Sequence, residues 1–441
     1  MSARQSRLPF HPPFYYGWVI LGMTMVSAFL AAGSSQLFMG IMLKPISEDL
    51  GWTRTMTAGA ITAGTFVAGA LSPLVGVLAD RQGPRLLMPI GAAVVSLALL
   101  ALAGLQALWQ FYLAYVVARS VATVCLGNVV PLTTAANWFY QKRGRALGLV
   151  SMSLPLGGSL LALLGQYIIT IASWRTVFVV FGVLVAVVVI GPSALLMRRR
   201  PEDVGLTPDG AAPDPPGNAR PAEGAKAAPG EFSFTLAEAL RTPTLWLLIA
   251  SELVGITANG AVGFHQVAYY TDIGITAAAA TAALSSYGLA GAFSSGLWGF
   301  LTERFSVRLL ATGVAVLAAV ASGLLLIVQN EATAIGISAL YGLAARGEGP
   351  LLNMIIARYY GRDSFGVISG FATPFLMAGL GLGPLVGSLA FDLTGTYRGA
   401  FILFIFLYLL TAVFLFLAWP PRLPQRALTR RTPQEILPGG G

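Results

Sequence analysis

The chain has 441 residues, of which 56% are apolar and only 10% are charged, and its formal net charge is +9. Because soluble domains carry about 25% charged residues, this composition excludes an ordinary soluble protein and favours one that lies in a lipid bilayer. One cysteine, Cys125, excludes a disulfide framework, and two histidines offer little for a metal site. We therefore expect no metal and no other cofactor.

Apolar runs long enough to cross a bilayer, which takes about 20 residues, recur along the whole chain. The first is too long for the core of a signal peptide, so we expect it to be retained as a membrane span. The sequence predicts an all-α membrane protein with twelve transmembrane helices. The expected spans are residues 17–43, 53–79, 86–106, 108–138, 146–172, 176–197, 242–270, 278–301, 309–329, 332–360, 365–393 and 399–419.

The segment between the sixth and seventh spans has a different composition. Residues 198–231 are rich in Pro, Gly, Ala and Asp, which favours a flexible linker. Thr235 and Glu238 have the spacing of a capping box and predict a short surface helix over 232–241. The expected domains are an N-terminal six-helix bundle (1–197), a linker with this helix (198–241), a C-terminal six-helix bundle (242–420) and a tail (421–441).

The basic residues lie mainly in short loops, where they set membrane orientation rather than bind nucleic acid. Twelve spans place both termini on one side. That side carries twenty-one Lys and Arg residues, whereas the other side carries only Lys44, Arg54, Arg175 and Arg398. Because positive loops stay inside, we expect cytoplasmic termini and a location in the cytoplasmic (inner) membrane.

A charged turn follows the second span, and a similar turn follows the eighth. The two turns are 223 residues apart, so that Gly76 of the first corresponds to Gly299 of the second. The same spacing relates similar residues at several other positions. Repeats of this length indicate a duplicated membrane domain built as two pseudo-symmetric six-helix halves. The shift pairs Asp80 with Glu303, Arg81 with Arg304 and Arg85 with Arg308.

The twelve spans, the repeat and the turn Gly76-Val-Leu-Ala-Asp-Arg-Gln-Gly-Pro-Arg85 resemble the major facilitator superfamily. Residues Tyr16-Gly17-Trp18, Ser173-Trp174-Arg175 and Tyr359-Tyr360-Gly361-Arg362 are similar to its monocarboxylate porter and oxalate:formate antiporter branch. The resemblance implies the major facilitator fold and solute transport by alternating access, in which two halves rock around a central site.

The resemblance also implies a role for the charged turns. In the family, the turn acids and arginines tie helix ends of the two halves together when the protein is open outward. The alternative is that these charges only orient the helices in the membrane. The expected conformational latch comprises Gly76, Asp80, Arg81, Arg85, Glu303, Arg304 and Arg308.

Four charged residues lie deep inside the expected spans: Arg119, Glu252, Arg346 and Glu348. An ionisable group at such depth costs on the order of 3 kcal/mol and is a functional candidate. Arg346 and Glu348 are two residues apart on one helix, so each needs a partner on another helix, and structural ion pairs are the alternative reading. If a glutamate pairs with an arginine in the empty protein, its protonation frees the guanidinium to bind a carboxylate.

Other polar residues at depth complete the candidate set. The expected substrate-binding residues are Arg346, Arg119, Gln36, Asn128, Asn259 and Asn353, and the expected proton-coupling residues are Glu348, Glu252 and His265. Interhelical hydrogen bonding explains the amides equally well, and a lone histidine near a helix end is often only a hydrogen-bonding residue. The charged residues typical of the branch in helices 1, 8 and 11 are absent here, so any anion site must be built from Arg346 and Arg119.

These observations predict a secondary transporter for a small organic anion, in particular a monocarboxylate, coupled to protons and active as a monomer among membrane lipids. An efflux antiporter for amphipathic compounds and a sensor that binds solute without moving it are the alternatives. No set of nucleophile and base that would indicate an enzyme is evident.

Overall fold

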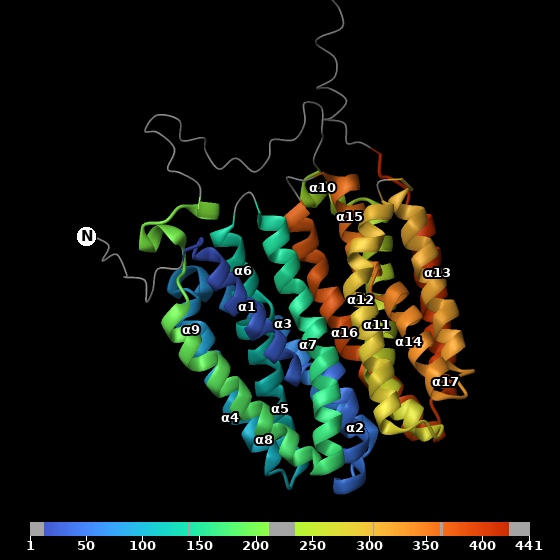
Figure 1. Ribbon diagram of the computed structural model, residues 1–441. Coiled ribbons are helices and arrows are strands. Elements are labelled where there is room, and N and C mark those ends of the chain that lie inside the picture. The colour runs from blue at the N-terminus through green and yellow to red at the C-terminus, as the bar shows by residue number, and fades with distance from the viewer. Residues whose placement is uncertain (1–12, 140–141, 211–233, 303, 362–364, 423–441) are drawn as a thin grey trace, which may run out of the picture.

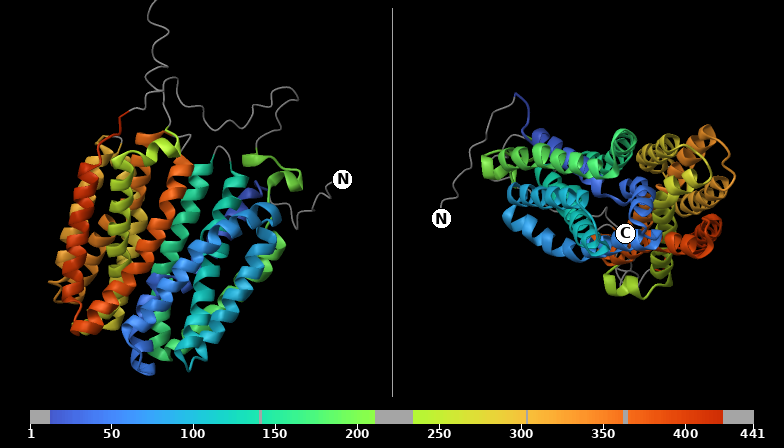
Figure 2. Two further views of the ribbon diagram at one scale, coloured as in Figure 1. Left: turned by 180° about the vertical axis from the view of Figure 1, so that it is seen from behind. Right: turned by 90° about the horizontal axis from the view of Figure 1, so that it is seen from below.

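The computed structural model describes residues 13–139, 142–210, 234–302, 304–361 and 365–422. The described residues form helices and no strand, as the all-α prediction requires. Figure 1 shows two groups of steeply inclined helices side by side, one blue to green and one yellow to red. The view along the helices in Figure 2 shows the same division into an N-terminal and a C-terminal half.

The first half contains the helical elements that precede residue 197, including two π-helical turns within longer helices. They are α1 (Gly17–Ala31), η1 (Ala32–Ser34), α2 (Gln36–Leu50), α3 (Arg54–Gln82), α4 (Pro84–Ala103), α5 (Leu108–Val121), η2 (Ala122–Gly127), α6 (Val129–Trp138), α7 (Arg143–Ile171), α8 (Trp174–Val185), η3 (Ala186–Ile190) and α9 (Gly191–Leu196).

The second half begins with the short surface helix, whose capping box between Thr235 and Glu238 is present as predicted. Its elements are α10 (Leu236–Leu240), α11 (Pro243–Asp272), α12 (Ala277–Leu301), α13 (Val307–Leu325), α14 (Glu331–Ala345), α15 (Glu348–Tyr360), α16 (Phe365–Thr394) and α17 (Arg398–Leu417).

Among the described residues, 10 helices are long and apolar enough to cross a membrane. The two other expected spans coincide with α12 and with the pair α14 and α15, which fall outside that set. The chain is therefore a multi-pass membrane protein, while the count of twelve spans stays a prediction. In the expected linker, residues Pro201–Val204 and Pro208–Gly210 form short 3₁₀ helices, and residues 211–233 and 423–441 lie outside the described part.

The expected span 332–360 is not one continuous helix. α14 ends at Ala345, Arg346 and Gly347 join the two helices, and α15 begins at Glu348. Pro350 cannot donate a backbone hydrogen bond, so a continuous ladder cannot pass this point. The expectation that Arg346 and Glu348 lie on one continuous helix is thus corrected, since Arg346 follows a helix C-terminus and Glu348 begins the next helix.

Two more spans are interrupted near their middle. The first bends at η1 and restarts at α2, where Ser35 is extended and its hydroxyl accepts from the backbone of Phe38. The fourth contains the π-helix η2 and breaks at Asn128. Around the fourth and tenth spans the repeat is offset by 221 rather than 223, as the match of Asn137-Trp-Phe139 with Arg358-Tyr-Tyr360 indicates. This offset carries residues 122–127 onto 343–348, so the fourth and tenth spans break at corresponding places. Discontinuous helices at matching positions of two repeats are typical of transporter binding sites.

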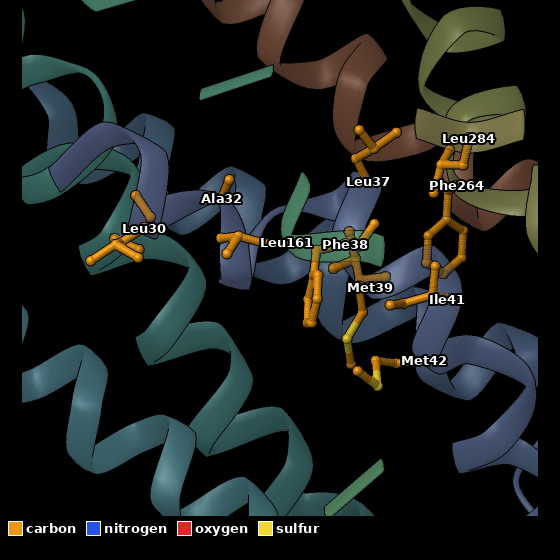
Figure 3. Packing of buried hydrophobic residues seen from close by; sticks show 14 of the residues in the cluster. Leu30, Ala32, Leu37, Phe38, Met39, Ile41, Met42, Leu161, Phe264 and Leu284 are labelled. Atoms are coloured by element: carbon orange, nitrogen blue, oxygen red, sulfur yellow. The ribbon is translucent and has the colours of Figure 1, made fainter. Parts of the chain in front are cut away.

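The larger hydrophobic core extends across both halves and lies around α2. It joins Phe38, Ile41 and Leu161 of the first half to Phe264 and Leu284 of the second. Figure 3 shows the Phe264 ring of α11 beside Ile41 of α2. Gly40 makes this approach possible, because a Cβ atom there would lie 2.6 Å from the backbone oxygen of Phe264. A second cluster, which includes Val307, Leu351 and Ile355, is confined to the second half.

The two halves are held together at the end that carries Lys44 and Arg54, the outer end by the positive-inside argument. Asp272 of α11 accepts from Arg54 at 2.7 Å and from Lys44 at 3.2 Å. Asp392 of α16 accepts from the backbone of Thr55. Deeper contacts join Thr62 to the Gly381 carbonyl and Ser285 to the Ser159 carbonyl. Between described residues, the hydrogen bonds that cross from one half to the other lie from the middle of the bundle to this end.

Asp272→Asn should loosen this closed outer end. It removes a carboxylate shared by two cations, one of which, Arg54, is largely buried, so we expect a cost of about 1 kcal/mol, or roughly fivefold more of the outer-open state. A Thr62→Cys reporter in a Cys125→Ser background should then react faster with a membrane-impermeant thiol reagent. Asp49→Asn is the control, because Asp49 pairs with Arg175 within the first half. Equal labelling in both variants would contradict the assignment of Asp272 to closure.

Candidate functional site

A cavity lies between the two halves near the middle of the bundle. Its volume is about 190 Å³. The three interrupted or bent spans of the first and second halves meet there, because Ser35, Arg119 and Arg346 all contribute to its wall. The lining residues are Ser35, Gln36, Leu37, Arg119, Leu154, Pro155, Gly158, Ile256, Asn259, Gly260, Gly263, Tyr287, Arg346 and Leu380.

Each arginine of the central cavity is half-buried and lies against a glycine of a neighbouring helix. A Cβ at Gly64 of α3 would lie 2.8 Å from Cγ of Arg119, and one at Gly291 of α12 would lie 2.5 Å from Cγ of Arg346. The Arg346 guanidinium also lies 5.2 Å from the Tyr287 ring centroid, a cation–π distance. Small residues thus admit two long charged side chains into the core, one from each half.

The ion pairs expected between these charges are not formed here. Within the described residues, the ion pairs involve Lys44, Arg54, Arg175 and Arg199, and none includes the cavity arginines. Nε of Arg119 and Nε of Arg346 are both buried without a hydrogen-bond partner. A buried unpaired cation is costly, so an anion in this cavity would offset the cost of placing both guanidinium groups there.

The first turn of α2 adds to the positive character of the central cavity. Helix N-termini carry unpaired N–H groups and a partial positive charge, and Ser35, Gln36 and Leu37 at this N-terminus line the cavity. Nε2 of Gln36 donates to the Gly260 carbonyl of the other half at 2.7 Å. Its Oε1 is buried without a partner, so it can accept from a hydroxyl or an acidic proton.

The three asparagines predicted to line the site have different positions. Asn259 lines the cavity, where it accepts from the Tyr287 hydroxyl and donates to the Ala345 carbonyl at the end of α14. It therefore supports the helix break beside Arg346. Asn128 and Asn353 are both exposed, and neither is among the lining residues.

The two deep glutamates lie close to each other rather than to the arginines. The Glu348 carboxylate lies over Gly255 of α11, one helical turn from Glu252, and the two acids interact electrostatically. Glu348 is 8% exposed, and its Oε1 has no hydrogen-bond partner among the described residues. Burying such a carboxylate is costly, and binding a proton removes that cost.

His265 lies apart from these acids, inside the outer closure. Nε2 of His265 faces the Pro384 carbonyl at 2.8 Å, and since a carbonyl only accepts, this nitrogen carries the proton. Nδ1 then accepts from the Tyr397 hydroxyl, whose oxygen accepts from Arg54. Burial raises the pKa of Tyr397 and nearby Arg54 opposes this, so the hydroxyl keeps its proton and donates. Both ring nitrogens are engaged by second-half residues, and the Tyr397 hydroxyl carries the contact on to Arg54 of the first half.

The expected latch residues are only partly described. Glu303 and the side chain of Asp80 lie outside the described residues. Arg85 donates to the Ala194 carbonyl within the first half. Arg308 donates to the Phe416 carbonyl within the second half, and Arg81 and Arg304 are exposed. A latch between the halves stays a prediction for the conformation in which this end closes.

Sequence reasoning missed Ser35 and Tyr287, which the helix breaks and helix packing bring to the central cavity. Ser35 had a visible signal, because Gly33-Ser-Ser-Gln36 is polar and small in the middle of an apolar span. Tyr287 had none, since an aromatic residue in a span is ordinarily a packing residue.

Comparison with known proteins gives a consistent result. The family model "Major Facilitator Superfamily" matches residues 24–271 and 259–438. Human monocarboxylate transporter 6 is 28% identical over 167 residues, 38% of this chain and 33% of that protein. The oxalate:formate antiporter of Oxalobacter formigenes is 21% identical over 291 residues, 66% of this chain and 63% of that protein. The agnestins efflux protein of Paecilomyces divaricatus is 24% identical over 352 residues, 78% of this chain and 72% of that protein.

The first relatives are therefore matched over only part of their length, a third for monocarboxylate transporter 6. A solved structure of a bacterial homologue of the human lysosomal transporter Spinster, in an inward-facing and unoccupied conformation, superposes with a TM-score of 0.71. The superposition includes 96% of this chain and 99% of the Spinster homologue, at 16% sequence identity, and it shows that the two share a fold. With the family model matching nearly the whole chain, this protein belongs to the Major Facilitator Superfamily.

Proposed function

We propose that this protein is a secondary transporter that carries a small organic anion bearing a carboxylate, coupled to protons, across the cytoplasmic membrane. The observation that carries the proposal is the pair Arg119 and Arg346, which come from different halves, line one cavity and have no ion-pair partner among the described residues. An anion that binds both guanidinium groups also joins the two halves. The interface between two repeats is where transporters of this kind bind substrate, while the halves rock around it.

The size of the central cavity favours a small substrate. Pockets that hold drug-sized ligands measure about 300–1,000 Å³, whereas this cavity measures about 190 Å³. The efflux alternative is supported by the similarity to the agnestins efflux protein. In the conformation that the structure shows, a cavity of this size fits a short carboxylate better than a drug-sized compound.

The closed outer end supports a cycle in which the substrate is released to the side that holds the basic loops. The hydrogen bonds between the halves lie outward of the central cavity, and the second hydrophobic cluster is confined to one half. Opening the outer end would require the Asp272 contacts to break. The arginines would then face the outside, and Glu348 with Glu252 would supply the proton site.

Uptake by purified protein in liposomes tests the proposal. Short radiolabelled carboxylates should enter these liposomes faster than they leak into liposomes without protein. An inward proton gradient should raise both the rate of uptake and the final accumulation. Neutral amides of the same acids should not compete. Export of amphipathic compounds without carboxylate flux would favour the efflux alternative, and saturable binding without flux would favour a sensor.

A further inference from the structure

A second pocket lies at the end of the C-terminal half that carries the basic loops. Its volume is about 280 Å³, and it opens between the start of α13, the end of α15 and the chain after α17. It is separate from the central cavity and shares no residue with it. The lining residues are Ser306, Val307, Arg308, Ile355, Arg358, Tyr359, Trp419 and Pro420.

Two arginines of this pocket keep unused donors. Arg308 is 9% exposed, and its guanidinium stacks on the Trp419 ring at 3.5 Å. One of its nitrogens, Nη1, donates to the Phe416 carbonyl at 3.0 Å. Arg358 donates from Nη2 to the Thr302 carbonyl at 3.0 Å. Neither forms an ion pair with a described acid, so both retain charge and donors for an anion.

The N-terminus of α13 faces the same pocket without a side-chain cap. Ser306 occupies the N-cap position, but its hydroxyl makes no capping hydrogen bond. The helix is 19 residues long, so its unpaired first-turn N–H groups and its dipole favour a negative group here. A phosphate suits a site formed by a helix N-terminus together with arginines.

The rim of the pocket is apolar and faces outward from the bundle. Leu309 of α13 is 52% exposed, Phe416 of α17 is 50% exposed and Trp419 is 60% exposed. In a multi-pass membrane protein, exposed apolar side chains at a helix end contact lipid, and tryptophan marks the headgroup level. An anion in this pocket therefore lies where phospholipid headgroups lie, with acyl chains able to follow the exposed face of α13 and α17.

We propose that this pocket binds the phosphate of an anionic phospholipid, with Arg308, Arg358 and the first turn of α13 as its ligands. The acyl chains extend over Leu309 and Phe416. Because Arg358 also holds the Thr302 carbonyl at the start of the charged turn, an occupied pocket steadies that turn. This site is independent of the substrate and of its coupling.

Native mass spectrometry of the full chain in neutral detergent tests the proposal. Phosphatidylglycerol should be retained at least about tenfold more tightly than phosphatidylcholine. Arg358→Gln, at an exposed position that does not disturb the core, should lower phosphatidylglycerol affinity on the order of tenfold, the value of one charge-assisted hydrogen-bond pair. Arg308→Gln should have a similar effect, although loss of its contacts with Phe416 and Trp419 also lowers stability.

Arg304→Gln is the matched control, since Arg304 lies in the same turn but does not line the pocket. Its affinity for phosphatidylglycerol should stay within about twofold of the unchanged protein. Equal losses in Arg304→Gln and Arg358→Gln would show a diffuse charge effect and overturn the site. Displacement of phosphatidylglycerol by millimolar inorganic phosphate would overturn the choice of a lipid in favour of a soluble phosphate.

Discussion

Arg346→Gln is expected to reduce carboxylate uptake by roughly thirtyfold or more. Truncating one partner of a buried charge pair costs about 2–5 kcal/mol, and each 1.4 kcal/mol is about tenfold. The loss should appear as a raised KM, because the guanidinium contacts the bound anion before any conformational change. Uptake by Arg346→Lys should lie between that of the unchanged protein and that of Arg346→Gln, since lysine keeps the charge but lacks the planar pair of donors.

The variant should still fold. Arg346 follows the C-terminus of α14, where a cation contributes only about 0.3–1 kcal/mol through the helix dipole, and its Nε makes no hydrogen bond in the structure. Thermal unfolding followed by size-exclusion chromatography should therefore show a small shift. Arg398→Gln removes the same charge from the same half at an exposed outer position and should leave uptake unchanged.

Arg119→Gln offers an independent check from the other half. Because the proposed anion contacts both guanidinium groups, Arg119→Gln should also raise KM, and the double variant should cost less than the sum of the two singles. Normal KM in Arg346→Gln with a lower unfolding temperature would assign Arg346 to structure. The anion site would then need other ligands.

Much of the fold followed from the sequence because bilayers constrain it strongly. A span must be apolar and helical, so runs such as 53–79 and 399–419 correspond closely to α3 and α17. The capping box at Thr235 also acts locally and was predicted correctly. The helix breaks were missed because counting apolar residues ignores them, although Gly347-Glu348-Gly349-Pro350 carries a visible breaking signal.

The candidate site was predictable in its charges and less so in its partners. Depth in the membrane singled out Arg119 and Arg346, and the structure brings both to one cavity with Gln36 and Asn259. Asn128 and Asn353 lie elsewhere, because a helix break or a turn of rotation changes which face a side chain occupies. Contacts such as Gln36 with Gly260 also depend on which end is closed, and a sequence specifies both conformations at once.

Glu348→Gln is expected to abolish proton-driven accumulation while leaving exchange intact. For one proton carried with each monoanion, a gradient of one pH unit supplies about 1.4 kcal/mol, or tenfold accumulation. Glutamine resembles the protonated carboxyl in size and charge but cannot release a proton. The variant should therefore equilibrate labelled substrate across the membrane, with an accumulation ratio near one instead of about ten.

The geometry explains why exchange should survive. Glu348 lies over Gly255 and not against Arg346, so its replacement leaves both cavity arginines in place. Exchange of external label for internal substrate needs only substrate binding and movement of the loaded protein, whereas net uptake also requires the empty protein to return. An unprotonated, buried Glu348 beside Glu252 is costly in one of the two conformations, and that cost is what couples the return step to proton release.

Glu331→Gln is the matched control, because Glu331 is an exposed acid on α14 at the outer end. It should keep tenfold accumulation per pH unit. Glu252→Gln separates the two deep acids: if they share one proton, either substitution should lower accumulation, and their effects should not add. Full accumulation in Glu348→Gln combined with loss in Glu252→Gln would move the coupling proton to α11, and full accumulation in both would place it outside this pair.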